Sequence, residues 1–359
     1  MVAVNFDVDR TDFRHTRCVS SAPPTELPAD HVLLEIESFA FTANNITYAV
    51  AGDMLDYWGF FPTDAPWGRI PVMGIGRVTQ SSHPDIKVGG RYFGFYPMSD
   101  HHVVDASPVH GGFVDRAEHR ADHAAAYRSF NLVRSDPAYD PAIEGQYLIA
   151  RGLFVTSFLI DDFLDEHHCF GASTVVITSA SSRTAIALAH CLRARGGVKV
   201  VGLTARRNLA FTASVGLYDT VLTYDDLESI DANTPAVVVD MSGNADVLRR
   251  VHDHLGERLM YSCRVGATHW DAEGSTDDLP GPAPTFFFAP AQMKKRAHDW
   301  GRDAYDARVS TALAAFLEHA RSWMVIERSC GPEAVAAVYC ATLEGVNSPE
   351  LGHILRLAR

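Results

Sequence analysis

A regular alternation of short apolar strands and helices from residue 174 onward constrains the fold of this chain most strongly. The run TVVIT at residues 174–178 is continuous and β-branched, as in a strand that is covered on both faces. Residues 182–195 follow as a helix with one apolar face, and Gly196 and Gly197 stop it. A strand, a helix and a further strand in this order predict parallel β-α units.

The same unit recurs along the chain. Further strands are predicted at residues 198–204, 219–224, 236–241 and 258–265. A helix that ends at Gly216 separates the second strand from the third, and a helix at 148–164 precedes the series. This pattern predicts a Rossmann-type cofactor-binding domain with a parallel sheet, which we place at residues 147–289.

The first 110 residues have a different character and are rich in β-formers. Strands are predicted at residues 31–41 and 90–96. Residues 44–67 lie between them and are too aromatic for a solvated loop, so this segment either fills the core or lines a pocket. We therefore expect an α/β protein whose β-rich substrate domain occupies residues 1–146.

The end of the chain is too short to form a domain alone. It is predicted to be helical from Pro290 to about Trp323, with a further helix at 333–343 and a closing strand at 353–357. We expect residues from about 290 to 359 to return to the β-rich domain and complete it.

Charge and cysteine usage exclude several classes of function. With 31 basic and 44 acidic residues, the net charge of −13 argues against nucleic acid or an anionic membrane as the main partner. No apolar run of about 18 residues and no export signal is found, so we expect a soluble, cytoplasmic protein. The six cysteines contain no C-x-x-C pair, and no Cys/His cluster has zinc-ligand spacing, so we expect reduced thiols and no metal.

The turn after the first predicted strand is the candidate phosphate-binding corner. It lacks a G-x-G-x-x-G motif but supplies small side chains, hydroxyl groups and one positive charge. The candidate residues are Ser179, Ser181, Ser182, Arg183 and Thr184. The alternative is that Ser181 or Ser182 only caps the helix.

The end of the second predicted strand indicates which cofactor fits. A site for NAD usually has an acidic residue there, whereas a site for NADP has a neutral residue and a nearby arginine. This strand ends in Thr204 and is followed by Arg206 and Arg207, which favours a 2′-phosphate. The alternative is that both arginines are simply solvated.

The fourth and fifth predicted strands end in small turns. These turns place Ser242, Gly243, Val265 and Gly266 at the carboxyl edge of the sheet, where the ribose and nicotinamide of a dinucleotide would lie. We include these four residues among the candidates for cofactor binding.

Four long stretches of the sequence resemble one known superfamily when they are taken in order. They are residues 31–53, 70–95, 176–205 and 331–357. Together they resemble the medium-chain dehydrogenase/reductase superfamily, nearest its zinc-free, quinone-oxidoreductase-like branch. Within it, the segments YWGFFP, SASSRTA, SCRVGATHW and FFFAPAQM are similar to an uncharacterised group described only as a domain of unknown function. The resemblance implies a GroES-like β-rich domain joined to the Rossmann domain.

Departures from the superfamily pattern bear on the chemistry. Its zinc enzymes carry a cysteine and a Gly-His-Glu motif, which fall here on Ala43 and on residues 72–74 (Val-Met-Gly). The resemblance therefore implies a zinc-independent protein. Short-chain reductase chemistry is excluded separately, because no lysine lies four residues after a tyrosine.

A reduction without a metal needs another donor for the developing oxyanion. A tyrosine, an asparagine amide or the cofactor's own ribose hydroxyl can provide it. The resemblance places the aromatic segment beside the nicotinamide, so the candidates there are Tyr48, Tyr57 and Asn45. His269, just past the fifth strand, is a further candidate that would relay a proton.

Three hypotheses follow for the function. The first is an NADP(H)-dependent reductase of a small apolar ketone, enone or quinone. The second is an NADP(H)-binding redox sensor or complex partner without turnover, and the third is a fold that has lost dinucleotide binding and takes another ligand. We expect a small-molecule substrate as the partner, and the sequence leaves a homodimer open.

Overall fold

The strands of the predicted Rossmann-type region form one parallel sheet in the computed structural model, which describes residues 3–265 and 279–358. The strand order is β12-β11-β10-β13-β14-β15. The strands are β10 (Thr174–Ile177), β11 (Lys199–Thr204), β12 (Thr220–Thr223), β13 (Ala236–Asp240), β14 (Leu259–Arg264) and β15 (Thr285–Phe286). From β10 the chain adds β11 and then β12 on one side, and from β13 it adds β14 and then β15 on the other side. The topological switch point, where such sheets bind ligands, is therefore between β10 and β13.

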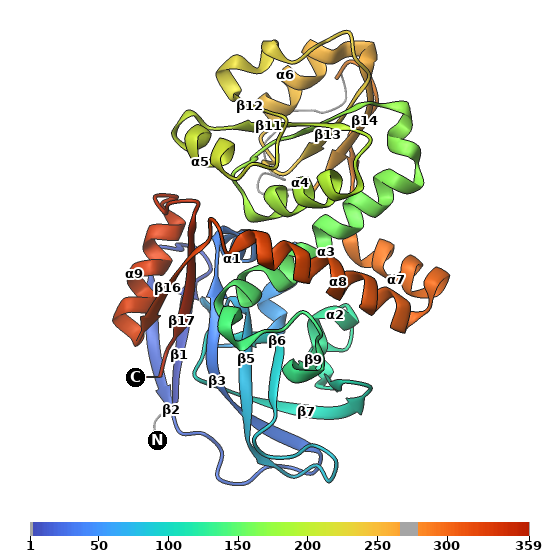
Figure 1. Ribbon diagram of the computed structural model, residues 1–359. Coiled ribbons are helices and arrows are strands. Elements are labelled where there is room, and N and C mark those ends of the chain that lie inside the picture. The colour runs from blue at the N-terminus through green and yellow to red at the C-terminus, as the bar shows by residue number, and fades with distance from the viewer. Residues whose placement is uncertain (1–2, 266–278, 359) are drawn as a thin grey trace. The chain divides into compact units, whose positions relative to one another are not determined.

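Helices cover both faces of this sheet. The helices in this part of the chain are α3 (Glu144–Glu166), α4 (Arg183–Arg195), α5 (Leu209–Ser214), α6 (Ala245–Leu255), α7 (Ala289–Trp300) and α8 (Arg302–Ala320). Figure 1 shows α4 and α6 on opposite faces. The apolar face of α6 packs Leu248 and Val251 against Val176 and Val238 of the central strands, and all four side chains are almost fully buried. This packing fixes the carboxyl ends of β10 and β13 in place.

The β-rich region forms a closed antiparallel barrel. Its strands are β3 (His31–Phe41), β5 (Pro71–Ser81), β6 (Arg91–Pro97), β9 (Ser129–Leu132), β8 (Gly112–Asp115) and β7 (His101–Val109). The barrel closes because β3 pairs with both β5 and β7. The predicted fold class, a GroES-like domain with a Rossmann domain, is confirmed.

Several smaller elements complete this region (Figure 1). They are β1 (Ala3–Asp9), β2 (Thr16–Ser21), β4 (Trp67–Gly68), α1 (Ala43–Val50), α2 (Ala125–Arg128), β16 (Val325–Cys330), α9 (Pro332–Leu343) and β17 (Leu351–Arg356). The last strand, β17, pairs with β3, so the end of the chain adds to the barrel sheet. The sequence predicted α9 and β17. It did not predict β1, β2 or β16.

The chain divides into two compact units at boundaries that differ in part from those placed from the sequence. The first unit comprises residues up to 149 and from 320 onward, and the second comprises residues 150–319. Helices α7 and α8, which the sequence assigned to the first domain, belong to the second unit. The reason is a set of long-range contacts with α3: Arg296 and Gln292 bind the Asp162 carboxylate at 2.5 and 2.9 Å, and the rings of Phe154 and Phe316 lie 5.4 Å apart.

Candidate functional site

The turn between β10 and α4 is built around the N-terminus of a helix. Ser182 is the N-cap, and its hydroxyl oxygen accepts a hydrogen bond from the Ala185 N–H at 3.3 Å. Within the described residues, the N–H groups of Ser181 and Thr184 donate to no other group. Free N–H groups at the start of a helix of 13 residues are suited to bind an anion. The serine therefore caps the helix, and the turn keeps donors for a phosphate.

A glycine on the neighbouring strand allows the turn to lie close to the sheet. A Cβ atom at Gly202 of β11 would come within 2.9 Å of the Ala180 Cβ atom and of the Tyr218 ring. Ser179 has a φ of +49°, a left-handed conformation that favours glycine. The absence of a side chain at Gly202 therefore leaves room for the turn and for Tyr218 beside β11.

Two tyrosines that were not among the sequence candidates hold the turn. The Tyr218 hydroxyl donates to the Ala180 carbonyl oxygen at 2.7 Å. The Tyr224 hydroxyl oxygen accepts a hydrogen bond from the Ser179 N–H at 2.9 Å, which leaves its own proton able to donate to a ligand. Tyr224 follows β12 directly, and this position at a strand end was the signal available in the sequence.

A buried carboxylate joins the ends of β10 and β13 at the switch point. Asp240 is 1% exposed. Its Oδ1 atom accepts hydrogen bonds from the Thr178 hydroxyl at 2.6 Å, the Ser242 hydroxyl at 2.7 Å and the Ser242 N–H at 3.0 Å. Gly243 follows with a φ of +64°. Asp240 therefore fixes the conformation of the turn that carries the candidates Ser242 and Gly243.

The corner after β11 contains both the predicted arginines and an acidic residue. Thr204 is fully buried, so its side chain lies inside the domain, whereas Arg206 and Arg207 are exposed in the 3-10 helix η6 (Arg206–Asn208). Arg206 forms an ion pair with Asp225 at 3.2 Å. Asn208 donates from its side-chain amide to the Ser181 hydroxyl oxygen at 2.9 Å, which connects this corner to the phosphate turn.

The remaining cofactor candidates that the structure describes are Arg183 and Val265. Arg183 is half-buried, and burial lowers its pKa to about 10, so it keeps its positive charge at neutral pH. Val265 donates its N–H to the Asp240 carbonyl oxygen at 2.9 Å, which places it directly beside the β13 turn. Gly266 and the catalytic candidate His269 lie outside the described residues.

The aromatic segment of the first unit brings three phenols together. The rings of Tyr48 and Tyr57 lie 4.5 Å apart, and the Tyr57 hydroxyl is hydrogen-bonded to that of Tyr127 from α2. Burial raises the pKa of both Tyr48 and Tyr57 well above the usual value, so both stay protonated. Tyr48 is only 7% exposed, whereas Tyr57 is less buried and lies in the 3-10 helix η1 (Tyr57–Phe60). Tyr127 was not a sequence candidate.

Asn45, the amide candidate, is used to hold the first unit together. Its Oδ1 atom accepts a hydrogen bond from the Thr42 N–H at 2.8 Å, and its Nδ2 atom donates to the Pro71 carbonyl oxygen at 3.0 Å. The side chain is 4% exposed. Asn45 therefore caps α1 and attaches it to β5.

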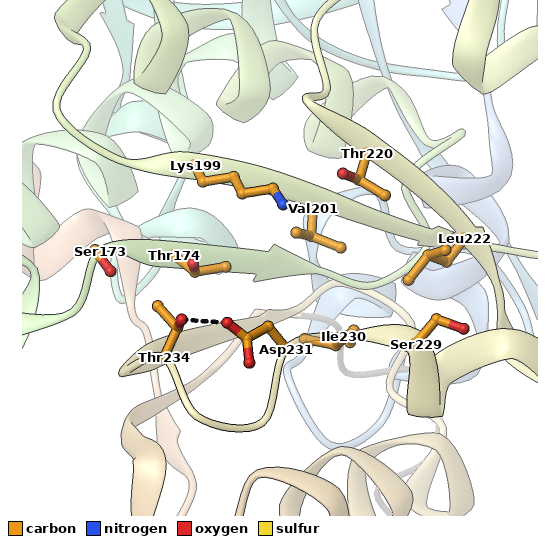
Figure 2. Close-up of a pocket in the computed structure, with 10 residues that line it drawn as sticks. All are labelled: Ser173, Thr174, Lys199, Val201, Thr220, Leu222, Ser229, Ile230, Asp231 and Thr234. Carbon is orange, nitrogen blue, oxygen red and sulfur yellow. Dashed lines mark hydrogen bonds between the residues drawn. The ribbon is translucent and has the colours of Figure 1, made fainter.

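A hollow of about 200 Å³ lies at the opposite, amino edge of the parallel sheet (Figure 2). Lys199, Thr174 and Thr220 line it from the starts of three strands, and Asp231, held by the Thr234 hydroxyl at 2.6 Å, lines it from a turn. Ligands of parallel sheets bind at the carboxyl edge. We therefore assign the candidate site to the phosphate turn and not to this hollow.

Neither a metal cluster nor a membrane span is found in the part of the chain that the structure describes. Across residues 3–265 and 279–358, no three His, Cys, Asp or Glu side chains come together to hold a metal ion. Within the same residues, no helix is long and apolar enough to cross a bilayer.

The sequence matches the model of one protein family over most of its length. The family described as "Protein of unknown function (DUF2855)" matches residues 39–347. The chain belongs to this family. No curated protein matches the chain.

Solved structures place this member of the DUF2855 family in the medium-chain dehydrogenase/reductase fold. TarJ of Staphylococcus aureus in complex with NADPH has a TM-score of 0.60 at 12% identity, with 100% of both chains covered. The quinone oxidoreductase of Coxiella burnetii has a TM-score of 0.55 at 13% identity, with 99% of this chain and 100% of that chain covered. At these identities the likeness establishes the fold alone.

The same fold also occurs with bound metal. The cobalt- and zinc-bound thermostable alcohol dehydrogenase of Pyrobaculum aerophilum has a TM-score of 0.55 at 15% identity, with 99% of this chain and 100% of that chain covered. The fold therefore does not decide whether a metal is used, and the side chains of this chain must be considered directly.

Proposed function

We propose that this DUF2855 protein is a zinc-independent, NADP(H)-dependent oxidoreductase that reduces a small apolar ketone, enone or quinone. The observation that carries the proposal is the phosphate turn, in which the N–H groups of Ser181 and Thr184 remain available at the N-terminus of α4. Such donors, together with the helix dipole, stabilise a pyrophosphate. That TarJ is a similar fold solved with NADPH supports the same cofactor class.

The residues present fit a phosphorylated dinucleotide. Ser181, Thr184 and the Tyr224 hydroxyl would hold the pyrophosphate, and Arg206 and Arg207 offer positive charge to a 2′-phosphate. The turn at Ser242 and Gly243, fixed by Asp240, would hold the ribose next to the nicotinamide. NADPH supplies a hydride when it is bound.

The phenols of the first unit are the proposed donors to the substrate oxygen. A carbonyl that is reduced acquires negative charge on its oxygen, and a neutral hydroxyl group stabilises that charge by donating a hydrogen bond. Because burial raises its pKa, Tyr57 keeps its proton at neutral pH and suits this role. The surrounding rings of Phe60 and Tyr127 favour an apolar substrate.

The proposal is tested in two steps. Fluorescence titration with NADPH and NADH measures cofactor binding, and a consumption assay on a panel of ketones, enones and quinones then measures turnover. We expect NADPH to bind more tightly and to be consumed with at least one class of substrate. Failure to bind either nucleotide would contradict the proposal, whereas binding without turnover on any substrate would indicate a redox sensor.

A further inference from the structure

The ends of two neighbouring strands bring an arginine and an aspartate together beside the phosphate turn. Strands β11 and β12 are parallel and pair Thr204 with Thr223, so the residues that follow each strand share one edge of the sheet. Arg206 follows β11, and Asp225 lies in the 3-10 helix η7 (Tyr224–Ser229) after β12. Their Nη2 and Oδ2 atoms are 3.2 Å apart, and the side chains are 68% and 71% exposed.

Residues close in the sequence to each member of this ion pair bind the phosphate turn. Asn208, at the end of η6, donates to the Ser181 hydroxyl oxygen. Tyr224, which directly precedes Asp225, accepts from the Ser179 N–H. The pair therefore stands at the corner where the adenosine ribose of the proposed cofactor would lie.

The two side chains recognise different forms of that ribose. A guanidinium group binds a 2′-phosphate through charge-assisted hydrogen bonds, whereas a carboxylate accepts a hydrogen bond from a free 2′-hydroxyl. A 2′-phosphate that binds Arg206 competes with Asp225 for the same guanidinium and lies close to a second negative charge. A free 2′-hydroxyl meets no such repulsion.

We infer that Asp225 is a specificity-determining residue that opposes the 2′-phosphate and limits the preference for NADPH over NADH. This inference rests on the proposed function and deepens it. The end of β11, where a carboxylate would recognise a free 2′-hydroxyl, holds Thr204, and Asp225 supplies a carboxylate from the 3-10 helix after the neighbouring strand instead.

A second ion pair on the same 3-10 helix provides a matched control. Glu228 of η7 pairs with Arg250 of α6 at 2.7 Å, and its side chain is 62% exposed. The substitutions Asp225→Asn and Glu228→Gln each remove one exposed negative charge from η7 and keep the shape of the side chain. Any effect of overall charge is therefore common to both variants.

The experiment compares ligands that differ only in the 2′-phosphate. Adenosine 2′,5′-bisphosphate and adenosine 5′-monophosphate are titrated calorimetrically into wild type, D225N and E228Q, and NADPH and NADH are titrated in parallel. We expect D225N to bind the bisphosphate about fivefold more tightly than wild type, with no gain for the monophosphate. The gain should shrink at about 1 M salt, where the screening length is only ~3 Å.

The possible outcomes separate this inference from the proposed function. If wild type binds none of the four ligands, the proposed function fails and the role of Asp225 fails with it. If the ligands bind but D225N leaves the ratio between bisphosphate and monophosphate unchanged, or lowers it, only the role of Asp225 is overturned. An equal gain in E228Q would also overturn it, because the effect would then be one of net charge. Melting temperatures of both variants within about 1 °C of wild type would show that the fold is intact.

Discussion

The Tyr224 hydroxyl oxygen lies 2.9 Å from the backbone nitrogen of Ser179 and accepts its hydrogen bond. Ser179 is the residue with left-handed backbone at the start of the phosphate turn. A side chain that follows β12 therefore satisfies a donor at the end of β10, two strands away in the sheet. Because the Tyr224 oxygen is the acceptor in this bond, its hydroxyl proton is left to donate to a phosphate oxygen.

Replacing Tyr224 by phenylalanine should weaken the binding of NADPH. The substitution removes a charge-assisted hydrogen bond to a phosphate oxygen, worth about 1.5–3 kcal/mol, so we expect a loss of roughly ten- to a hundredfold in affinity. The measurement is a fluorescence titration with NADPH. Tyr218→Phe is the comparison, because it removes the other tyrosine hydrogen bond to the turn, at the Ala180 carbonyl, but no donor to the ligand, so it should lower NADPH affinity less than Tyr224→Phe does. Unchanged NADPH affinity in Tyr224→Phe would remove Tyr224 from the site.

The two arginines after β11 should determine the preference for the phosphorylated cofactor. Losing a charge-assisted contact to phosphate costs about 1.5–3 kcal/mol, or roughly ten- to a hundredfold in affinity. The double variant Arg206→Ala, Arg207→Ala should therefore bind NADPH more weakly and NADH almost unchanged. Dissociation constants of both nucleotides for the variant and wild type test this. Equal affinities of wild type for NADPH and NADH would contradict it.

The location of the candidate site could be predicted from the sequence, because the signals for it are local. A β-branched run followed by Ser182 and an apolar helix face identifies a strand, an N-cap and a helix within about twenty residues. The contacts that complete the site are not local. Tyr218 and Tyr224 meet the turn only because β11 pairs with β10 on one side and with β12 on the other, and a register of pairing is not visible in a single sequence.

The assignment of α7 and α8 illustrates the same limit. Their helical pattern was predicted, but the compact unit to which they belong was not. That unit depends on ion pairs such as Arg296 with Asp162, which are 134 residues apart in the sequence. Asn45 is a similar case. Its amide has the right chemistry for an oxyanion donor, yet it is used by Thr42 and Pro71, and only the structure reveals these partners.

Folding and activity should not depend on a metal ion. The positions of the superfamily's zinc ligands hold Ala43, Met73 and Gly74, which have no side chain that coordinates zinc well. Purified protein should contain well under one equivalent of zinc by elemental analysis. Incubation with a strong chelator should leave the melting temperature and any turnover unchanged. Stoichiometric zinc, or unfolding on chelation, would show that the prediction is wrong.

Stability of the second unit should fall on acidification because of His190 on α4. Burial, together with the nearby His319, lowers the pKa of His190 from 6.5 to about 4. Between these pH values the unfolded chain binds a proton that the folded chain does not. The contribution of neutral His190 to the free energy of unfolding is therefore full above pH 6.5. It falls by at most about 1.4 kcal/mol for each pH unit as the pH drops toward 4. Urea unfolding at pH 7.5, 6.5 and 5.5 should be less pH-dependent in His190→Gln than in wild type. The exposed His298, replaced in the same way, is the control, and an equal slope in all three proteins would contradict the prediction.

The hydroxyl groups of Tyr48 and Tyr57 provide a test of which residue donates a hydrogen bond to the substrate oxygen. An oxyanion donor acts mainly in the transition state, so removing it should lower kcat by about 10²–10³ and leave the affinity for NADPH almost intact. Tyr57→Phe and Tyr48→Phe each remove one hydroxyl group and keep the ring packing. We expect the larger effect from Tyr57, because Tyr48 is more deeply buried and its hydroxyl is hydrogen-bonded to the Asn44 side chain. Steady-state kinetics on a confirmed substrate measure both.

A third variant separates donation by Tyr57 from its position. Tyr127→Phe keeps the Tyr57 hydroxyl but removes its hydrogen-bond partner, so it should lower kcat less than Tyr57→Phe does.

If Tyr57→Phe and Tyr48→Phe both react at the wild-type rate, tyrosine is not the donor. The ribose hydroxyl of the cofactor and His269 would then be the remaining candidates, because the Asn45 amide already binds Thr42 and Pro71 and is 4% exposed. A proton relay through His269 would give kcat a pH dependence that is lost in His269→Gln, whereas donation by the ribose hydroxyl would not.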